Sequence, residues 1–115
     1  MNRTATIEPE VTDYEMIQAT HAVLGMLSPR WAVEVLYTLA GGTRRHSELL
    51  YEVGEISKKT LTQTLRGLQR DGLVVRQVHA DVPVRVEYSL TPLGWSLTEP
   101  LVALYEWAAA ELRGR

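Results

Sequence analysis

The sequence predicts an α+β domain that is mainly α. Its central stretch, residues 57–71, has leucines at helical spacing and polar side chains on the remaining faces, which is typical of an amphipathic helix. Two β-rich runs follow within residues 73–90 and predict a hairpin. A short apolar segment and a glycine-containing turn precede the central stretch. This order predicts a winged helix-turn-helix, and we expect the helices at the two ends of the chain to be N- and C-terminal dimerisation helices.

The first eleven residues, 1–11, show no periodicity, and we expect a flexible N-terminal arm there. The first helix should start at a capping box, in which Thr12 and Glu15 satisfy each other's backbone N–H groups. Its apolar face would consist of Met16, Ile17, Thr20, Val23, Leu24 and Leu27.

A second helix is expected after Ser28, which is a suitable cap, with Pro29 in the first turn where its missing N–H costs nothing. The helix should run to about Ala40 and end at a pair of glycines. Because its residues are apolar nearly all round, we expect it at the buried centre of the domain. Trp31 would then be a core or interface residue.

Residues 43–46 are expected to form a short strand that pairs with the later hairpin. Ser47 is a suitable cap for a short helix that ends near Val53. Gly54 then lies in a turn that leads to the central helix. A short helix, a turn with glycine and a second, polar-faced helix together predict a helix-turn-helix.

The helix at about residues 57–71 is the expected recognition helix, closed by Asp71 and Gly72. Its leucine stripe faces the core, and its other faces offer cations, hydroxyls and an amide. Such groups contact phosphates and base edges in a DNA major groove. The expected DNA-binding residues on this helix are Ser57, Lys58, Lys59, Thr60, Thr62, Gln63 and Arg66. The same composition also fits a solvated helix face that binds nothing.

The hairpin at about residues 73–90 is the expected wing, with its turn at residues 80–83. Arg76, Arg85 and His79 should lie along it or near its tip. We expect Arg76 or Arg85 to hold phosphates of double-stranded DNA together with the two lysines. The side chains better suited to base edges or nearby backbone are Thr60, Thr62, Gln63 and Arg66.

The last helix, at about residues 92–113, should begin with Thr91 as cap and Pro92 in the first turn. Pro100 should kink it or break it in two. One apolar stripe consists of Leu93, Leu97, Leu101, Leu104, Ala108 and Leu112, and a second of Trp95, Val102 and Ala109. Two apolar faces favour a homodimer through this helix and the first one; the alternative is burial in the chain's own core.

Composition limits the class of protein. The chain has 115 residues, a net charge of -2 and no cysteine, so we expect one domain without disulfides, thiol sensing or cysteine-ligated metals. The three histidines are scattered, and no phosphate loop, nucleophile motif or long apolar run occurs. We therefore expect a cytoplasmic protein that is not an enzyme, has no metal or cofactor and does not contact a membrane.

The charges are distributed unevenly. Residues 44–85 carry eight Lys/Arg against five Asp/Glu, residues 1–43 carry two against five, and residues 86–115 carry two against four. Only the segment that contains the expected recognition helix is positive. DNA binding should therefore depend on a local patch and weaken with salt.

Several segments, in this order, resemble the HxlR family of bacterial winged helix-turn-helix regulators. They are Arg30-Trp31, GTRRHSEL at residues 42–49, ISKKTLTQTLRGLQRDGL at residues 56–73, VPVRVEYSLTPLG at residues 82–94, and Glu106-Trp107. The resemblance implies a single domain over residues 12–115 and a DNA-binding transcription factor whose terminal helices form the dimer interface.

A homodimer of this kind would act on a short inverted-repeat operator, with one recognition helix per half-site spaced by about 34 Å. The alternative function is a winged-helix protein-interaction module without sequence-specific DNA binding, and the retained positive patch argues against it.

The chain departs from the family at three positions. Many members carry a sensing cysteine at about the position of Gln18, an aromatic residue at the position of His46 and a polar or basic residue at the position of Trp95. Without cysteine, the hypothesis is modulation by a small aromatic effector rather than by thiol oxidation. The residues expected at this ligand and dimer interface are Tyr14, Met16, Met26, Trp31, Trp95, Val102 and Trp107. Plain hydrophobic packing explains the same residues and is the favoured interpretation.

Overall fold

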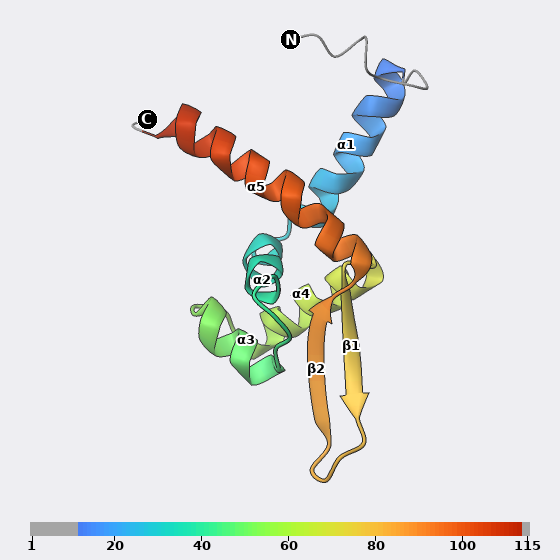
Figure 1. Ribbon diagram of the computed structural model, residues 1–115, viewed down its shortest axis with the longest axis vertical. Coiled ribbons are helices and arrows are strands. Elements are labelled where there is room, and N and C mark those ends of the chain that lie inside the picture. The colour runs from blue at the N-terminus through green and yellow to red at the C-terminus, as the bar shows by residue number, and fades with distance from the viewer. Residues whose placement is uncertain (1–11, 114–115) are drawn as a thin grey trace.

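The computed structural model describes residues 12–113, and the arm expected at residues 1–11 lies outside them. Three helices form a body from which a hairpin projects on one side and two long helices on the other (Figure 1). The elements in chain order are α1 Asp13–Leu27, α2 Ala32–Leu39, α3 His46–Val53, α4 Lys58–Arg70, β1 Val74–His79, β2 Arg85–Leu90 and α5 Pro92–Leu112. The mainly helical α+β class and the winged helix-turn-helix are confirmed.

The core lies where α2, α3, α4 and the base of the hairpin meet. Leu61, Leu65 and Leu68, the leucine stripe of α4, are buried as expected. The other buried apolar residues are Ala32, Val35, Leu36, Leu39, Leu49, Ile56, Leu73, Val74, Tyr88 and Leu90. Burial of apolar surface contributes about 25 cal/mol per Å², so the stripe fixes the rotation of α4 and leaves its polar faces outward.

Both ends of α4 are closed as the sequence predicted. The Ser57 hydroxyl accepts a hydrogen bond from the Thr60 N–H at 3.1 Å. At the other end, Gly72 has a φ of +78°, and the Leu73 N–H donates to the Leu68 carbonyl at 2.9 Å. This is a Schellman motif, and its left-handed position suits glycine.

The two strands pair antiparallel, with Val74 opposite Leu90 and His79 opposite Arg85. The short strand expected at residues 43–46 is present as a single bridge. Arg44 exchanges two backbone hydrogen bonds with Tyr88, at 3.0 and 2.7 Å. The bridge attaches β2 to the segment just before α3.

Two helix starts differ from the sequence prediction. The Ser28 hydroxyl donates to the Gly25 carbonyl at the end of α1 instead of capping the next helix, and residues 29–31 form a turn before α2. Helix α3 begins at His46, one residue before the expected cap Ser47, because the Glu48 carboxylate accepts from the Arg45 N–H at 2.7 Å.

Helix α2 also has an exposed side, which the sequence did not predict. Tyr37 is 81% exposed and Val33 is 44% exposed. A helix such as α2, whose residues are apolar nearly all round, can therefore bury one face and leave the other exposed.

Helices α1 and α5 diverge from the body (Figure 1). The Thr12 and Thr91 hydroxyls cap them by accepting from the N–H groups of Glu15 and Gly94, both at 3.0 Å. Helix α5 runs unbroken through Pro100, so of the two expected effects of this proline, a kink or a break, the break does not occur. No residue of α1 is buried, and within Pro92–Leu112 only Gly94 is buried.

None of the helices within residues 12–113 combines the length and apolar character needed to cross a membrane.

Candidate nucleic-acid interface

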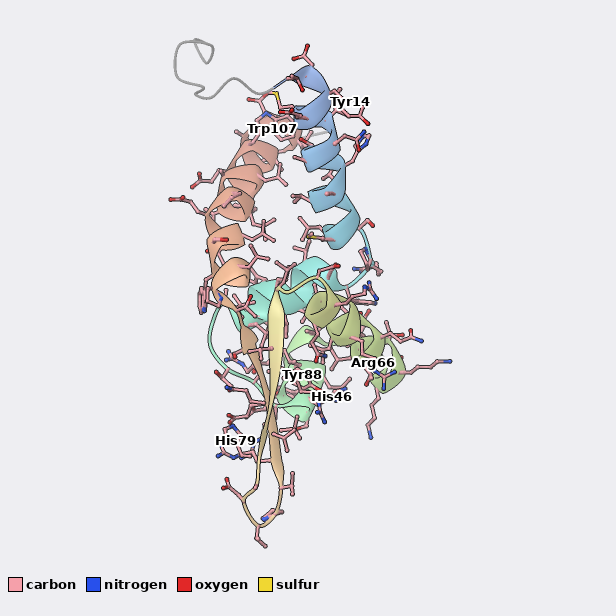
Figure 2. All side chains as sticks on the ribbon, turned by 90° about the vertical axis from the view of Figure 1, so that its right-hand side faces the viewer. Tyr14, His46, Arg66, His79, Tyr88 and Trp107 are labelled. Atoms are coloured by element: carbon pink, nitrogen blue, oxygen red, sulfur yellow. The ribbon has the colours of Figure 1, made fainter. Side chains whose placement is uncertain are left out.

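The face of α4 opposite its buried leucines is polar, exposed and free of carboxylates. At 100° per residue, the side chains directly opposite the stripe are Lys59, Gln63, Arg66 and Arg70, and all four are exposed. The helix carries four Lys/Arg and no Asp/Glu between its first and last residues. Figure 2 shows Arg66 pointing away from the body into solvent.

Several arginines outside α4 are already paired with carboxylates. Arg30 bonds Glu34 at 2.7 Å and Arg44 bonds Glu52 at 2.8 Å. On α4 itself, Arg70 lies 3.9 Å from Asp71. Among residues 12–113, the cations of the helix-turn-helix and hairpin with no acidic partner within 4 Å are Arg45, Lys58, Lys59, Arg66 and Arg76. The uncompensated positive charge therefore gathers on α4 and its two flanks.

The hydroxyls of the expected DNA-binding set take part in local structure. Ser57 caps α4 and also donates to the Thr60 hydroxyl at 2.9 Å. Thr62 is half-buried, and its hydroxyl lies 3.0 Å from the Nε2 of His46. Gln63 and Arg66 have no such bond among the described residues, so they remain free for a partner, as do Lys58 and Lys59 in the first turn of α4.

His46 lies at the junction of three elements. It is the first residue of α3, its ring bonds α4 through Thr62, and its centroid lies 6.5 Å from that of Tyr88 on β2. Figure 2 shows His46 and Tyr88 side by side between the hairpin and the helices. This contact links the position of α4 to the hairpin.

The two wing arginines differ in surroundings. Arg85 bonds Asp81 at 2.9 Å and Glu87 at 3.0 Å, and Glu87 also bonds His79 at 2.9 Å. The hydrogen bond to Asp81 is the main reason that the pKa of Arg85 is raised, against a smaller lowering by desolvation. Its charge is therefore balanced within the wing.

The strand register places the two arginines on opposite faces of the hairpin. Arg76 is opposite the core residue Tyr88, so its side chain starts on the face toward the helices. Arg85 is opposite His79 and shares the other face with Glu87. Arg76 is exposed and uncompensated, which makes it the better placed of the two for a partner bound by α4.

Sequence reasoning missed two cations at this surface. Arg70 follows Gln63 and Arg66 by seven and four residues, and helical spacing would have placed it on the same face. Arg45 directly precedes His46 and is exposed. Its neighbour Arg44 pairs with Glu52, whereas Arg45 has no acidic partner among the described residues. Two consecutive arginines were therefore the sequence signal that could have identified this cation.

The residues expected at a ligand and dimer interface do not converge in one chain. Met26 and Trp31 are half-buried and line a hollow of about 280 Å³ between the α1–α2 link and α4. Tyr14 is 71% exposed on α1, and Trp107 is 57% exposed on α5. The other three are half-buried Met16 on α1 and exposed Trp95 and Val102 on α5.

The described part of the chain, residues 12–113, contains no group of three or more His, Asp or Glu that could hold a metal ion.

The sequence of this chain is similar to those of known transcriptional regulators. A model of the family described as HxlR-like helix-turn-helix matches residues 26–114. The HTH-type transcriptional regulator YtfH of Escherichia coli K12 is 42% identical over 90 residues, which cover 78% of this chain and 71% of that protein. YkvN of Bacillus subtilis 168, described in the same words, is 43% identical over 90 residues, covering 78% and 74%.

A solved structure agrees over nearly the whole chain. It is described as a transcriptional regulator of the MarR family from Enterococcus faecalis V583. Its TM-score is 0.79 at 30% identity, and the match covers 96% of this chain and 93% of the other.

Proposed function

This chain belongs to the HxlR-like helix-turn-helix family of DNA-binding transcriptional regulators, and we propose that it acts as a homodimer on a short inverted-repeat operator. The observation that carries the proposal is the carboxylate-free outer face of α4, opposite three buried leucines. A protein surface that binds DNA phosphates needs Lys and Arg side chains that are not already neutralised by carboxylates of the protein itself.

Within this proposal, α4 enters the major groove of double-stranded DNA. Lys58 and Lys59 lie in its first turn, which is exposed, and they hold phosphates together with Arg45 and Arg76. Gln63 and Arg66 read base edges, since an amide pairs with adenine and a guanidinium with guanine. Thr60 and Thr62 act mainly by fixing the helix itself, because their hydroxyls are bonded within the protein.

The dimer is argued from α1 and α5. Helix α1 has 15 residues, none of them buried, and an isolated helix of that length is marginal in water. Large apolar side chains remain exposed on both helices, among them Ile17 and Leu24 on α1 and Leu104 and Tyr105 on α5. A second copy of the chain would cover these faces and would place two copies of α4 about 34 Å apart on one side of the duplex.

Regulation through thiol oxidation is impossible in this chain, because it contains no cysteine. We therefore assign its modulation to a small aromatic effector that alters DNA binding. Trp31 and Met26 line a hollow directly against α4, which supports this assignment.

The test is a gel shift of the purified protein with its own upstream intergenic DNA, combined with the mass of the complex in solution. We expect retardation that resists excess unrelated DNA, weakens with salt and contains two chains per site. A complex with one chain per site would contradict the dimer, and full displacement by unrelated DNA would contradict the operator.

A further inference from the structure

The end of α4 and the start of α5 are joined by hydrogen bonds around Thr91. The Thr91 hydroxyl donates to the Gly72 carbonyl at 2.5 Å and accepts from the Gly94 N–H at 3.0 Å. The Thr91 N–H donates to the Leu73 carbonyl at 3.1 Å. Because Gly72 and Leu73 close the end of α4, one half-buried side chain holds the end of the recognition helix and the first turn of α5 together.

Close packing stiffens this junction, which we call the α4–α5 joint and which consists of Gly72, Leu73, Thr91 and Gly94. Gly94 is buried, and a Cβ there would collide with the Leu73 carbonyl. The backbone of α5 therefore lies directly against the backbone that leaves α4. Figure 1 shows the end of α4, the base of the hairpin and the start of α5 meeting at this point. Hydrogen bonds and backbone contact together fix the angle between the two helices.

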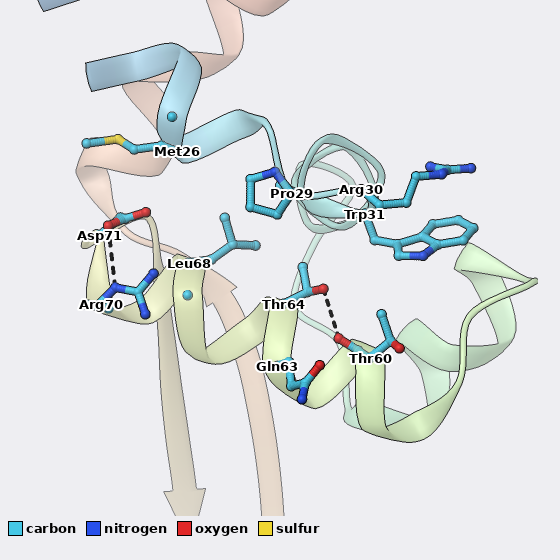
Figure 3. A pocket seen from close by; sticks show the side chains of 13 residues that line it. Met26, Pro29, Arg30, Trp31, Thr60, Gln63, Thr64, Leu68, Arg70 and Asp71 are labelled. Carbon is cyan, nitrogen blue, oxygen red and sulfur yellow. Dashed lines mark hydrogen bonds and ion pairs between the residues drawn. The ribbon is translucent and has the colours of Figure 1, made fainter. Parts of the chain in front are cut away.

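Helix α1 is attached to α4 less directly. A hollow of about 280 Å³ lies between them, and its lining includes Gly25 and Met26 of α1 and Gly67 and Leu68 of α4. Figure 3 shows Met26 and Leu68 on opposite sides of this space. Of the two helices assigned to the dimer, α5 is therefore the one whose direction is fixed relative to α4.

The length of α5 amplifies any change at the joint. With 21 residues, it is about 30 Å long, so a tilt of about 10° at its start would displace its far end by about 5 Å. One base pair adds about 3.4 Å to the length of a DNA duplex. In a dimer held by α5, such a tilt would change the distance between the two copies of α4 by more than one base pair.

We propose that Thr91 is a positioning residue for operator recognition, which fixes the half-site spacing that the dimer accepts by bonding the end of α4 to the start of α5. This inference rests on the proposed function, because it requires a homodimer on an inverted repeat. It concerns the distance between the half-sites, whereas Gln63 and Arg66 concern the bases within each half-site.

Substitutions can separate the joint from ordinary helix capping. Thr91→Val removes both hydrogen bonds of the hydroxyl, and Thr91→Ser keeps both. Thr91→Asp keeps an acceptor for the Gly94 N–H but cannot donate to the Gly72 carbonyl. The matched control is Thr12→Val, which removes the equivalent cap of α1, where the hydroxyl accepts from the Glu15 N–H at 3.0 Å.

The first measurement is the distance between the two recognition helices in the dimer without DNA. Because the chain has no cysteine, Arg66→Cys provides a single exposed site for a nitroxide label on α4. Pulsed electron paramagnetic resonance then gives the distribution of label distances. We expect a narrow distribution with Thr91 intact, with Thr91→Ser and with Thr12→Val. Thr91→Val and Thr91→Asp should broaden it by about 5 Å, the displacement expected for a tilt of about 10°.

The second measurement uses unlabelled proteins and the inverted repeat obtained by genomic selection. Its centre is lengthened or shortened by one base pair, and a single half-site is titrated in parallel. We expect the wild type to prefer its own spacing by at least about tenfold, and Thr91→Val and Thr91→Asp to reduce this preference to less than about threefold. Affinity for the single half-site should not change, and Thr91→Ser should behave as the wild type.

An unchanged distance distribution or spacing preference in Thr91→Val and Thr91→Asp would overturn the inference, as would a wild type that accepts all spacings equally. Equal broadening by Thr12→Val would assign the effect to loss of a cap. Loss of half-site binding or of helical circular dichroism in both Thr91→Val and Thr91→Asp would also overturn it, because Thr91 would then serve folding. A wild-type protein that is monomeric or binds no inverted repeat contradicts the proposed function instead.

Discussion

The Nε2 of His46 and the hydroxyl of Thr62 lie 3.0 Å apart, across the two helices of the helix-turn-helix. His46 starts α3, Thr62 lies on α4, and the histidine ring also faces Tyr88 of β2. A partly buried hydrogen bond at this junction fixes how α4 is presented relative to the wing. This hydrogen bond explains why a histidine stands at position 46, where the resemblance to the HxlR family led us to expect an aromatic residue.

The hydrogen bond predicts a coupling between two substitutions. His46→Phe keeps a ring against Tyr88, and Thr62→Val keeps the shape of threonine, so each removes mainly the bond. In a double-mutant cycle followed by urea unfolding, we expect a coupling energy of about 0.5–1.5 kcal/mol. Thr64→Val is the control, because the Thr64 hydroxyl bonds the Thr60 carbonyl. Coupling as large with Thr64→Val would refute the specific pairing.

The charges of α4 and the wing predict different salt dependences. Lys59 has no acidic partner among the described residues, whereas Arg85 has two. Lys59→Gln should reduce the slope of log affinity against log salt by about one. Arg85→Gln should reduce it by less, because Asp81 and Glu87 already balance that charge. Anisotropy titrations over a salt series measure both slopes, and a larger effect of Arg85→Gln would reverse our assignment of the wing contact.

The apolar face of α5 predicts dimer variants. Leu104 is 54% exposed in the single chain, so Leu104→Glu should place a charge in the proposed interface and weaken the dimer by more than about tenfold. Sedimentation equilibrium measures the dissociation constant. Glu99→Lys lies on the same helix outside the apolar stripes and serves as the charge-change control. A Leu104→Glu protein as dimeric as the wild type would exclude this face from the interface.

One substitution should have opposite effects at two glycines. Gly67→Ala should raise the free energy of unfolding by about 0.5–1 kcal/mol, since alanine favours the helix and the space around Gly67 is open. Gly94→Ala should lower it by about 1–3 kcal/mol, because its Cβ would press on the Leu73 carbonyl where α5 meets the hairpin. Urea unfolding measures both. Destabilisation by Gly67→Ala would show that its hollow has a packing role.

The sequence predicted those features that depend on local chemistry. The leucine spacing and the Ser57 cap located α4, and the Thr91-Pro92 pair located the start of α5. The expected cap at Ser28 was wrong because its hydroxyl bonds backward to Gly25, a choice that depends on where the preceding helix ends. Helix α5 continues through Pro100 because one missing N–H does not outweigh a turn of helix on either side.

The site was harder to predict because it depends on pairing between distant residues. The Thr62–His46 contact joins residues sixteen positions apart and does not follow from spacing along the chain, whereas the ion pairs of Arg85 with Asp81 and Glu87 are local. The hollow is formed by segments about forty residues apart, which meet only once α1, α2 and α4 are packed. A glycine inside a helical pattern was the one local signal for it.

The central claim is that the outer face of α4 reads a specific, two-fold repeated DNA sequence. The most direct measurement is affinity selection of fragmented genomic DNA on the purified wild-type protein, with Arg66→Ala selected in parallel. We predict enrichment of an inverted repeat whose half-sites are about one helical turn apart, and loss or change of that motif with Arg66→Ala. Enrichment of no motif by the wild-type protein, or of the same motif by both proteins with equal strength, would contradict the account.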